Sequence, residues 1–203
     1  MRVLVACEYS GVVRDAFIAA GHLAMSCDLL PTDAPGPHHQ GDVLDILDDG
    51  WDLLIAHPPC TYLSNSGVRW LKDVQRWPHM IDGAVFFRTL LEAPIPRVAI
   101  ENPVMHGYAA RIVGRRQDQI VQPWMFGHPE TKATGLWLRG LPKLTPTDDV
   151  KAHMLTLPMK ERARVHYASP GPDRWKLRST TYAGIAKAMA SQWGGHMTEA
   201  VAS

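Results

Sequence analysis

The sequence predicts an α/β fold with a doubly wound, mostly parallel sheet. Short apolar runs typical of buried strands alternate along the chain with stretches of helical periodicity. Hydrophobic residues make up 46% of the 203 residues, a share typical of a globular protein with one core, so a single domain is expected over residues 1–203. Because ligands bind beyond the carboxyl ends of parallel strands, we expect the functional residues to follow those strands.

In the first half of the chain, three short apolar runs predict strands at residues 3–6, 23–27 and 53–56. Residues 12–20 carry apolar side chains at helical spacing, and Gly21 is expected to end that helix. A stretch rich in Pro and Gly predicts a loop at residues 31–41, followed by a brief helix at 43–47. Two prolines end the third strand, since proline has no backbone N–H to donate to a sheet.

In the second half, residues 80–91 predict a helix, and its apolar stripe is expected to contain Ile81, Ala84, Val85 and Leu91. Apolar runs predict strands at 97–101 and 133–138, and a last helix is expected at 182–193. Residues 139–178 have an irregular pattern with no long element.

The charges nearly cancel, with 21 Lys and Arg against 20 Asp and Glu, for a net charge of +1. This excludes a polybasic protein held to nucleic acid by bulk charge, so any such contact must be local. Aspartates crowd residues 28–52, whereas basic residues crowd 160–178. Each stretch is either a solvated loop or a functional surface. As functional surfaces, the acidic stretch would tolerate a cationic ligand and the basic stretch would face phosphates.

The three cysteines are too few and too widely spaced for a disulfide framework. No apolar run approaches the ~18 residues of a membrane span, and the chain starts without a charged-then-apolar leader. A cytoplasmic protein is therefore expected. No metal is expected either, because the adjacent His38 and His39 lack a second pair of ligands at metal-binding spacing.

The ends of the first two strands carry residues suited to a nucleoside cofactor. Ser10 and Gly11 precede a helix, where a ligand can approach the backbone closely. Asp28 follows the second strand, where a carboxylate can accept hydrogen bonds from a ribose, and Asp42 offers another acceptor.

The ends of the next two strands suggest covalent chemistry. Cys60 follows two rigid prolines after a strand, which favours a nucleophile over a packing residue, whereas Cys7 and Cys27 lie in apolar strands and are expected to be inert. Glu101 ends the fourth strand and would share a crevice with Cys60. A carboxyl group desolvated beside a base can stay protonated and donate to it.

These residues lie in stretches that resemble motifs of the cytosine-C5 DNA methyltransferases, in particular short phage- and prophage-encoded members. Pro58-Pro59-Cys60 with Ser64 and Gly67 resembles the motif Pro-Pro-Cys-x-x-Phe-Ser-x-x-Gly, with Leu63 in place of Phe. The stretch from Arg97 to Pro103 resembles the family's strand ending in Glu-Asn-Val. The stretch from Ser179 to Ala186 resembles its last motif, which folds back beside the first.

The resemblance implies a Rossmann-like methyltransferase fold and methylation of cytosine at C5 in DNA. Cys60 would add to C6, and Glu101 would hold N3 and the exocyclic amine of a base flipped out of the stack. The methyl donor would be S-adenosylmethionine, held by Ser10, Gly11, Asp28, Asp42 and Pro58. The expected substrate-binding residues are Ser64, Asn102, Lys132, Lys160, Arg162 and Arg164.

The chain departs from the family at three places. The family's glycine-rich first motif is reduced to Gly11, with Glu8 and Tyr9 in unusual places. The motif Gly-x-Pro-Gln-x-Arg-x-Arg aligns with residues 127–134, where Lys132 and Thr134 replace the arginines. Only residues 139–178 remain for target recognition, so a protein partner could supply it. Two alternatives to DNA methylation remain. The protein could modify C5 of a free pyrimidine nucleotide such as dCMP with a methyl or another one-carbon group, or it could be a relative that binds nucleic acid without catalysis.

Overall fold

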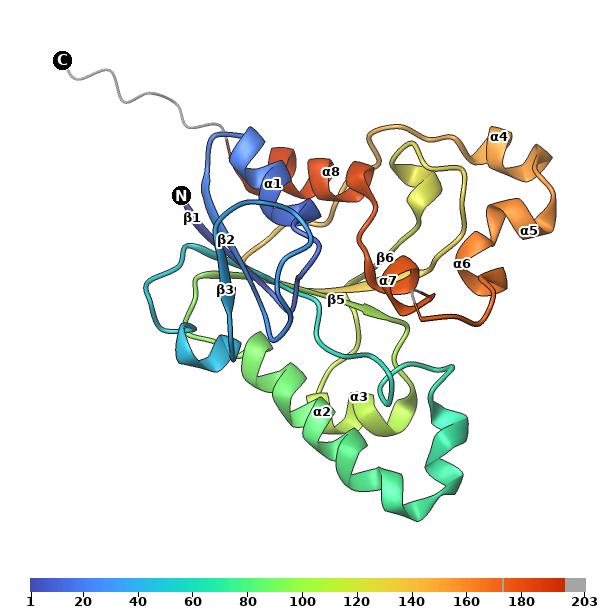
Figure 1. Ribbon diagram of the computed structural model, residues 1–203, viewed down its shortest axis with the longest axis horizontal. Helices are drawn as coiled ribbons and strands as arrows, with labels where there is room; N and C mark the ends of the chain where they lie inside the picture. The colour runs from blue at the N-terminus through green and yellow to red at the C-terminus, as the bar shows by residue number, and fades with distance from the viewer. Residues whose placement is uncertain (173, 196–203) are drawn as a thin grey trace.

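A computed structural model describes residues 1–172 and 174–195 (Figure 1). At its centre is a seven-stranded sheet in the order β3-β2-β1-β4-β5-β7-β6. The strands are β1 (Arg2–Ala6), β2 (Leu23–Asp28), β3 (His38–Gln40), β4 (Leu53–Ala56), β5 (Arg97–Pro103), β6 (Gln119–Val121) and β7 (Thr134–Arg139). Strands β1 to β5 are parallel to one another, and β7 is antiparallel to both β5 and β6. The predicted doubly wound, mostly parallel Rossmann-like sheet is therefore confirmed.

Helices cover both faces of this sheet (Figure 1). One face is covered by α1 (Val12–Ala19) and α8 (Ala183–Trp193), and the other by α2 (Trp77–Leu91) and α3 (Gly107–Val113). Side chains alternate between the faces along each strand, so Val3 packs with α1 and α8 whereas Leu4 packs with α2. This arrangement leaves the carboxyl ends of β1, β4 and β5 adjacent at one edge of the sheet.

The predicted strands and long helices are all present, with β4 at the predicted bounds. The sequence pattern missed β3, α3 and β6, which have three to seven residues each. The brief helix expected at 43–47 is the 3₁₀ turn η1 (Val43–Asp45). Three more 3₁₀ turns were not expected: η2 (Val68–Lys72), η3 (Val74–Arg76) and η4 (Pro123–Met125).

The expected apolar stripe of α2 is wrong in part. Ile81 and Val85 are 42% and 44% exposed, whereas Met80 and Phe87 are fully buried. This helix is apolar around most of its circumference, so the pattern alone does not determine which face packs on the sheet.

Residues 139–178 contain no long element, as expected, but they are not without structure. They form four helices of four to six residues: α4 (Lys151–Thr156), α5 (Met159–Arg162), α6 (Arg164–Tyr167) and α7 (Arg174–Ser179). Among the described residues, no helix is long and apolar enough to cross a membrane. Nor does any group of three or more His, Cys, Asp or Glu side chains in this part of the chain suit a metal ion.

Candidate active site

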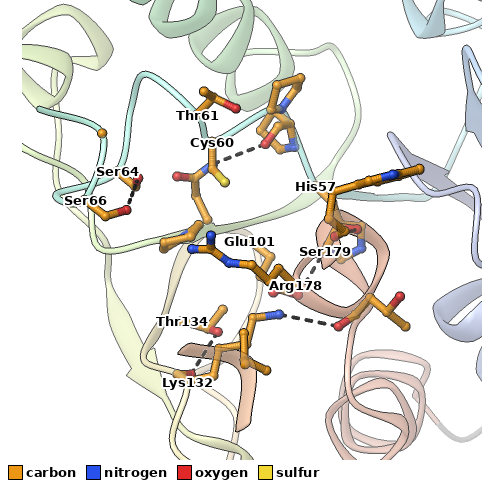
Figure 2. Close-up of a pocket in the computed structure, with 18 of the residues that line it drawn as sticks. His57, Cys60, Thr61, Ser64, Ser66, Glu101, Lys132, Thr134, Arg178 and Ser179 are labelled. Atoms are coloured by element: carbon orange, nitrogen blue, oxygen red, sulfur yellow. Dashed lines mark hydrogen bonds and ion pairs between the residues drawn. The ribbon is translucent and has the colours of Figure 1, made fainter. Parts of the chain in front are cut away.

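A cavity of about 790 Å³ opens where β1, β4 and β5 end. It is lined by the loop after each of these strands, by the residues that lead into β7, and by α7 with the stretch that joins it to α8. Cys60, Glu101, Lys132 and Arg178 surround the same hollow in Figure 2. The two predicted catalytic residues are therefore brought together by two neighbouring parallel strands.

The loop after β1 turns sharply into α1. Cys7 adopts a left-handed backbone with φ of 56°, and Gly11 has φ of 74°. The carboxylate of Glu8, only 4% exposed, accepts hydrogen bonds from the backbone N–H groups of Val13 at 2.7 Å and Arg14 at 3.2 Å. These groups lack partners within the helix, so Glu8 caps α1. Glu8 thus has a structural role that the sequence did not reveal.

Ser10 lines the cavity, but Gly11 is needed for a different reason from the one expected. A Cβ at Gly11 would lie 2.4 Å from Nη2 of Arg14. Arg14 is completely buried, and its guanidinium donates to the hydroxyl of Ser26 and to the carbonyls of Ala34 and Pro35. Gly11 therefore makes room for a buried arginine, and it is not among the residues that line the cavity.

The two aspartates expected to bind a cofactor lie near the β1 end but do not line the cavity. Asp28 accepts a hydrogen bond from the backbone of Leu30 at 2.9 Å, and Asp42 caps η1 through Leu44 at 3.0 Å. Burial, followed by the charges of Asp28 and Asp42 and by Cys27, raises the pKa of Cys7 to about 12. The raised pKa disfavours the thiolate form of Cys7, which also lines the cavity.

The loop that carries Cys60 is held from β5. The side-chain amide of Asn102 donates to the carbonyl of Pro58 at 3.3 Å, while its Oδ1 is buried without a partner among the described residues. Burial raises the pKa of the Cys60 thiol, and its backbone hydrogen bond and the charges of Lys132 and Arg178 act in the opposite direction. Nearby cations thus favour the thiolate within a pocket that otherwise disfavours it.

Glu101 forms an ion pair with His57, the residue that follows β4. Nδ1 of His57 lies 3.3 Å from Oε2 of Glu101, and the two side chains are only 12% and 10% exposed. Burial alone would raise the pKa of Glu101, but the hydrogen bond and charge of His57, the charge of Lys132 and the hydroxyl of Thr181 outweigh it and lower the pKa. The carboxyl group expected to stay protonated is thus ionised in the free protein.

The same contact acts on His57 in the opposite sense. Burial would lower the pKa of His57, whereas the hydrogen bond and charge of Glu101 raise it. Its other ring nitrogen, Nε2, is buried without a partner among the described residues. The contact with Glu101 therefore favours the protonated form of His57, and both side chains line the cavity.

The stretch between α7 and α8 contacts both halves of the site. The hydroxyl of Tyr9 lies 3.2 Å from that of Ser179, and Thr181 donates to Glu101 at 3.2 Å. Lys132 donates to the carbonyl of Thr180 at 3.4 Å. The last motif therefore lies beside the first, as the sequence resemblance implied.

The expected substrate-binding residues fall into two groups. Ser64, Asn102 and Lys132 line the cavity, whereas Lys160, Arg162 and Arg164 do not. Arg164 instead pairs with Glu130 at 2.9 Å, and the carbonyl of Arg162 accepts from the backbone of Thr131 at 2.6 Å. These contacts attach α5 and α6 to the loop that leads into β7.

Sequence reasoning missed His57, Thr181 and Arg178. A signal for His57 was present, because Ala56 pairs with Ile100 in the parallel register and the next residues of the two strands are His57 and Glu101. Arg178 comes from an element more than a hundred positions away, and no local pattern predicts its approach to Cys60.

Comparison with known proteins gives little guidance. No protein-family model and no curated protein matches the chain. Among solved structures, one described as a DNA modification methyltransferase encoded within an E. coli prophage has 17% sequence identity and a TM-score of 0.45, over 78% of this chain and 56% of that one. The Entamoeba histolytica methyltransferase EhMeth has 14% identity and a TM-score of 0.48, over 73% of this chain and 57% of that one. This chain thus spans a little over half the length of either structure.

Proposed function

We propose that this protein methylates cytosine at C5 in DNA, with S-adenosylmethionine as the methyl donor. The observation that carries the proposal is the meeting of Cys60 and Glu101 in one cavity, from loops that follow the adjacent parallel strands β4 and β5. A thiol and a carboxyl group placed across one pocket match the two ends of a pyrimidine ring, at C6 and N3. The sequence motifs around both residues support the same chemistry.

In this proposal Cys60 attacks C6 of the base as a thiolate. The new S–C6 bond displaces the electrons of the C5–C6 double bond, which makes C5 nucleophilic and N3 basic. In this proposal the His57–Glu101 pair supplies a proton to N3, since the two side chains lie 3.3 Å apart and both line the cavity. After methyl transfer, a water molecule takes the C5 proton, the electrons of that C–H bond re-form the C5–C6 double bond, and Cys60 leaves C6 as a thiolate. N3 then returns its proton to the pair.

The end of the cavity nearest β1 fits a nucleoside cofactor in part. Cys7, Tyr9 and Ser10 line it, and Pro58 borders it from the neighbouring loop. Asp28 ends the adjacent strand β2, although its carboxylate does not line the cavity. In this proposal S-adenosylmethionine would supply an electrophilic methyl group, and Ser10 and Pro58 would hold the donor.

The test is a product assay with a cysteine control. The purified protein is incubated with S-adenosylmethionine and unmethylated DNA, and the DNA is digested to nucleosides for mass spectrometry. We expect 5-methylcytosine from the wild-type protein and from Cys27→Ala, whose cysteine is fully buried in β2, and none from Cys60→Ala.

A parallel reaction with dCMP separates the substrates. Product from dCMP alone would replace DNA with a nucleotide as the substrate. Turnover by Cys60→Ala would remove the covalent mechanism, and absence of product from the wild-type protein would contradict the proposal as a whole.

A further inference from the structure

Two half-exposed tryptophans lie where the cavity opens to solvent. Trp70, on η2, is 45% exposed and Trp175, on α7, is 46% exposed, and both line the cavity. By contrast, Trp137 and Trp193 are no more than 2% exposed and belong to the core. The ring of Trp175 packs against that of Tyr9, with centroids 5.1 Å apart. The part of each tryptophan that stays exposed is a surface on which another planar group can stack.

Each of these tryptophans lies next to cationic side chains. The guanidinium carbons of Arg69 and Arg76 lie 4.7 and 5.4 Å from the ring centroid of Trp70. The ammonium of Lys176 lies 5.8 Å from the ring of Trp175. Arg76 and Lys176 also pair with aspartates, at 3.2 and 3.0 Å. The two platforms therefore combine an aromatic face with positive charge.

The cavity lining carries more basic than acidic side chains within a nearly neutral chain. Its basic residues are Arg69, Lys132, Arg174 and Arg178. Glu8 and Glu101 are the only acidic residues among the lining residues that the structure describes, and both are engaged, by the α1 N-terminus and by His57. This local excess of positive charge is complementary to phosphates.

Aromatic platforms interleaved with cations are suited to unpaired nucleic acid. Stacking on a tryptophan requires a base whose face is free, as in a single strand. In a duplex, the bases on either side of a flipped base remain stacked on their own neighbours and leave both platforms unused. A free nucleotide has one base and cannot occupy both tryptophans while also filling the cavity.

We propose that Trp70 and Trp175, with the arginines around them, bind single-stranded DNA across the cavity mouth. Bases on either side of the target stack on the two rings, and the phosphates between them contact Arg69, Arg174 and Arg178. The choice of DNA over RNA and the entry of the target base towards Cys60 rest on the proposed methylation, whereas the binding surface itself is defined without it.

Binding is measured by fluorescence anisotropy without any methyl donor. The probes are a labelled DNA 12-mer, the same strand as a duplex, the RNA strand of the same sequence, and dCMP as a competitor. The variants are Trp70→Leu, Trp175→Leu and Trp70→Phe. Trp124→Leu is the matched control, because Trp124 also lies under a cation, with Lys151 at 5.0 Å, but does not line the cavity.

The single strand is expected to bind more tightly than the duplex. Each change of a platform tryptophan to Leu should weaken single-strand binding about tenfold, whereas Trp70→Phe and Trp124→Leu should stay close to wild type. The slope of log affinity against log salt concentration separates stacking from charge. The Leu variants should keep the wild-type slope, whereas Arg69→Gln should lower its magnitude by about 0.7.

Three results would overturn the inference: tighter binding of the duplex, tighter binding of the RNA strand, or equal affinities of the two platform variants and Trp124→Leu. Thermal unfolding of each variant confirms that it is folded. If the protein methylates DNA but its binding does not depend on the two tryptophans, only the proposed binding surface is wrong. If binding depends on the tryptophans but no methylation occurs, only the proposed function is wrong.

Discussion

At the scale of single residues, the unusual feature of the site is a buried carboxylate that already pairs with a histidine before any substrate binds. Glu101 accepts from Thr181 and pairs with His57, so two neighbours fix its orientation. Such a buried pair is costly to break, because the remaining partner would be a charge without compensation. The same contacts that prepare Glu101 for a base thus also contribute to the stability of the fold.

The effect of pH on this pair follows from the two pKa shifts. The pKa of His57 is raised above its ordinary 6.5, so its stabilisation is complete below 6.5 and lost as pH rises through the folded-state pKa. The pKa of Glu101 is lowered below its ordinary 4.5, so its stabilisation is complete above 4.5 and lost as pH falls through the folded-state pKa. Both contributions are therefore complete between pH 4.5 and pH 6.5.

Glu101→Gln is therefore expected to destabilise the protein in a pH-dependent way. The loss in free energy of unfolding should be about 3 kcal/mol near pH 5.5, where His57 would need to stay charged without an anion, and smaller near pH 8.5. Urea unfolding followed by circular dichroism at the two pH values measures it. Glu92→Gln, which removes an exposed ion pair with Arg88, is the control and should change little at either pH. Equal losses for Glu101→Gln at both pH values would contradict the pairing.

At the scale of elements, the loop after β1 shows how a helix can begin without a standard cap. Gly11 at the N-cap offers no side chain, and Glu8 supplies the missing acceptor from three residues earlier. The negative charge also lies at the positive end of the α1 dipole. The position of Ser10 in the cavity therefore depends on Glu8.

Replacing Glu8 by Ala should leave two buried N–H groups of α1 without an acceptor. The expected loss in free energy of unfolding is about 1–3 kcal/mol, with more than half regained in Glu8→Gln, which keeps an oxygen acceptor. Chemical unfolding at neutral pH checks this against Glu161→Ala, an exposed residue in the first turn of α5. A Glu8→Ala protein as stable as wild type would show that another group caps α1.

The sequence predicted those elements whose pattern is local and strongly apolar. Strand β4 consists of four buried apolar residues followed by prolines, and its bounds were predicted correctly. Strand β3 was missed because its residues are polar and it forms only by pairing with β2. Helix α3 was missed because its N-cap is a histidine, His106, which accepts from Ala109. In the site, Cys60 and Glu101 were predicted from strand ends, whereas Arg178 depends on tertiary packing of α7.

At the scale of the whole molecule, charge is arranged to act locally. With a net charge of +1, the protein has no overall field that would attract DNA. Lys160, Arg162 and Arg164 lie on α5 and α6, and the neighbouring Val165 and His166 line the cavity. We still predict that these three residues contact phosphates beside the cavity mouth.

Changing all three to Gln should weaken DNA binding at low salt. The slope of log affinity against log salt should fall by about 0.7 for each phosphate of the single strand that the variant no longer neutralises. Titrations at several salt concentrations measure this slope. Replacing Lys143 and Lys187, which do not line the cavity, provides a control. If the triple variant and the wild type have the same salt slope, these three residues do not contact phosphates, and the contacts lie only at the cavity mouth.

The hydrogen bonds that close the site join distant parts of the chain. Tyr9 and Ser179 are separated by 170 positions, and Glu101 and Thr181 by 80. During synthesis, a nascent chain that already carries Cys60 and Glu101 still lacks the stretch that covers them. Contacts of such long sequence separation form late in folding, since their loop-closure entropy is lost before they contribute. A partly folded chain therefore displays its thiol without the walls of the pocket, and the complete site appears only when the last helix docks.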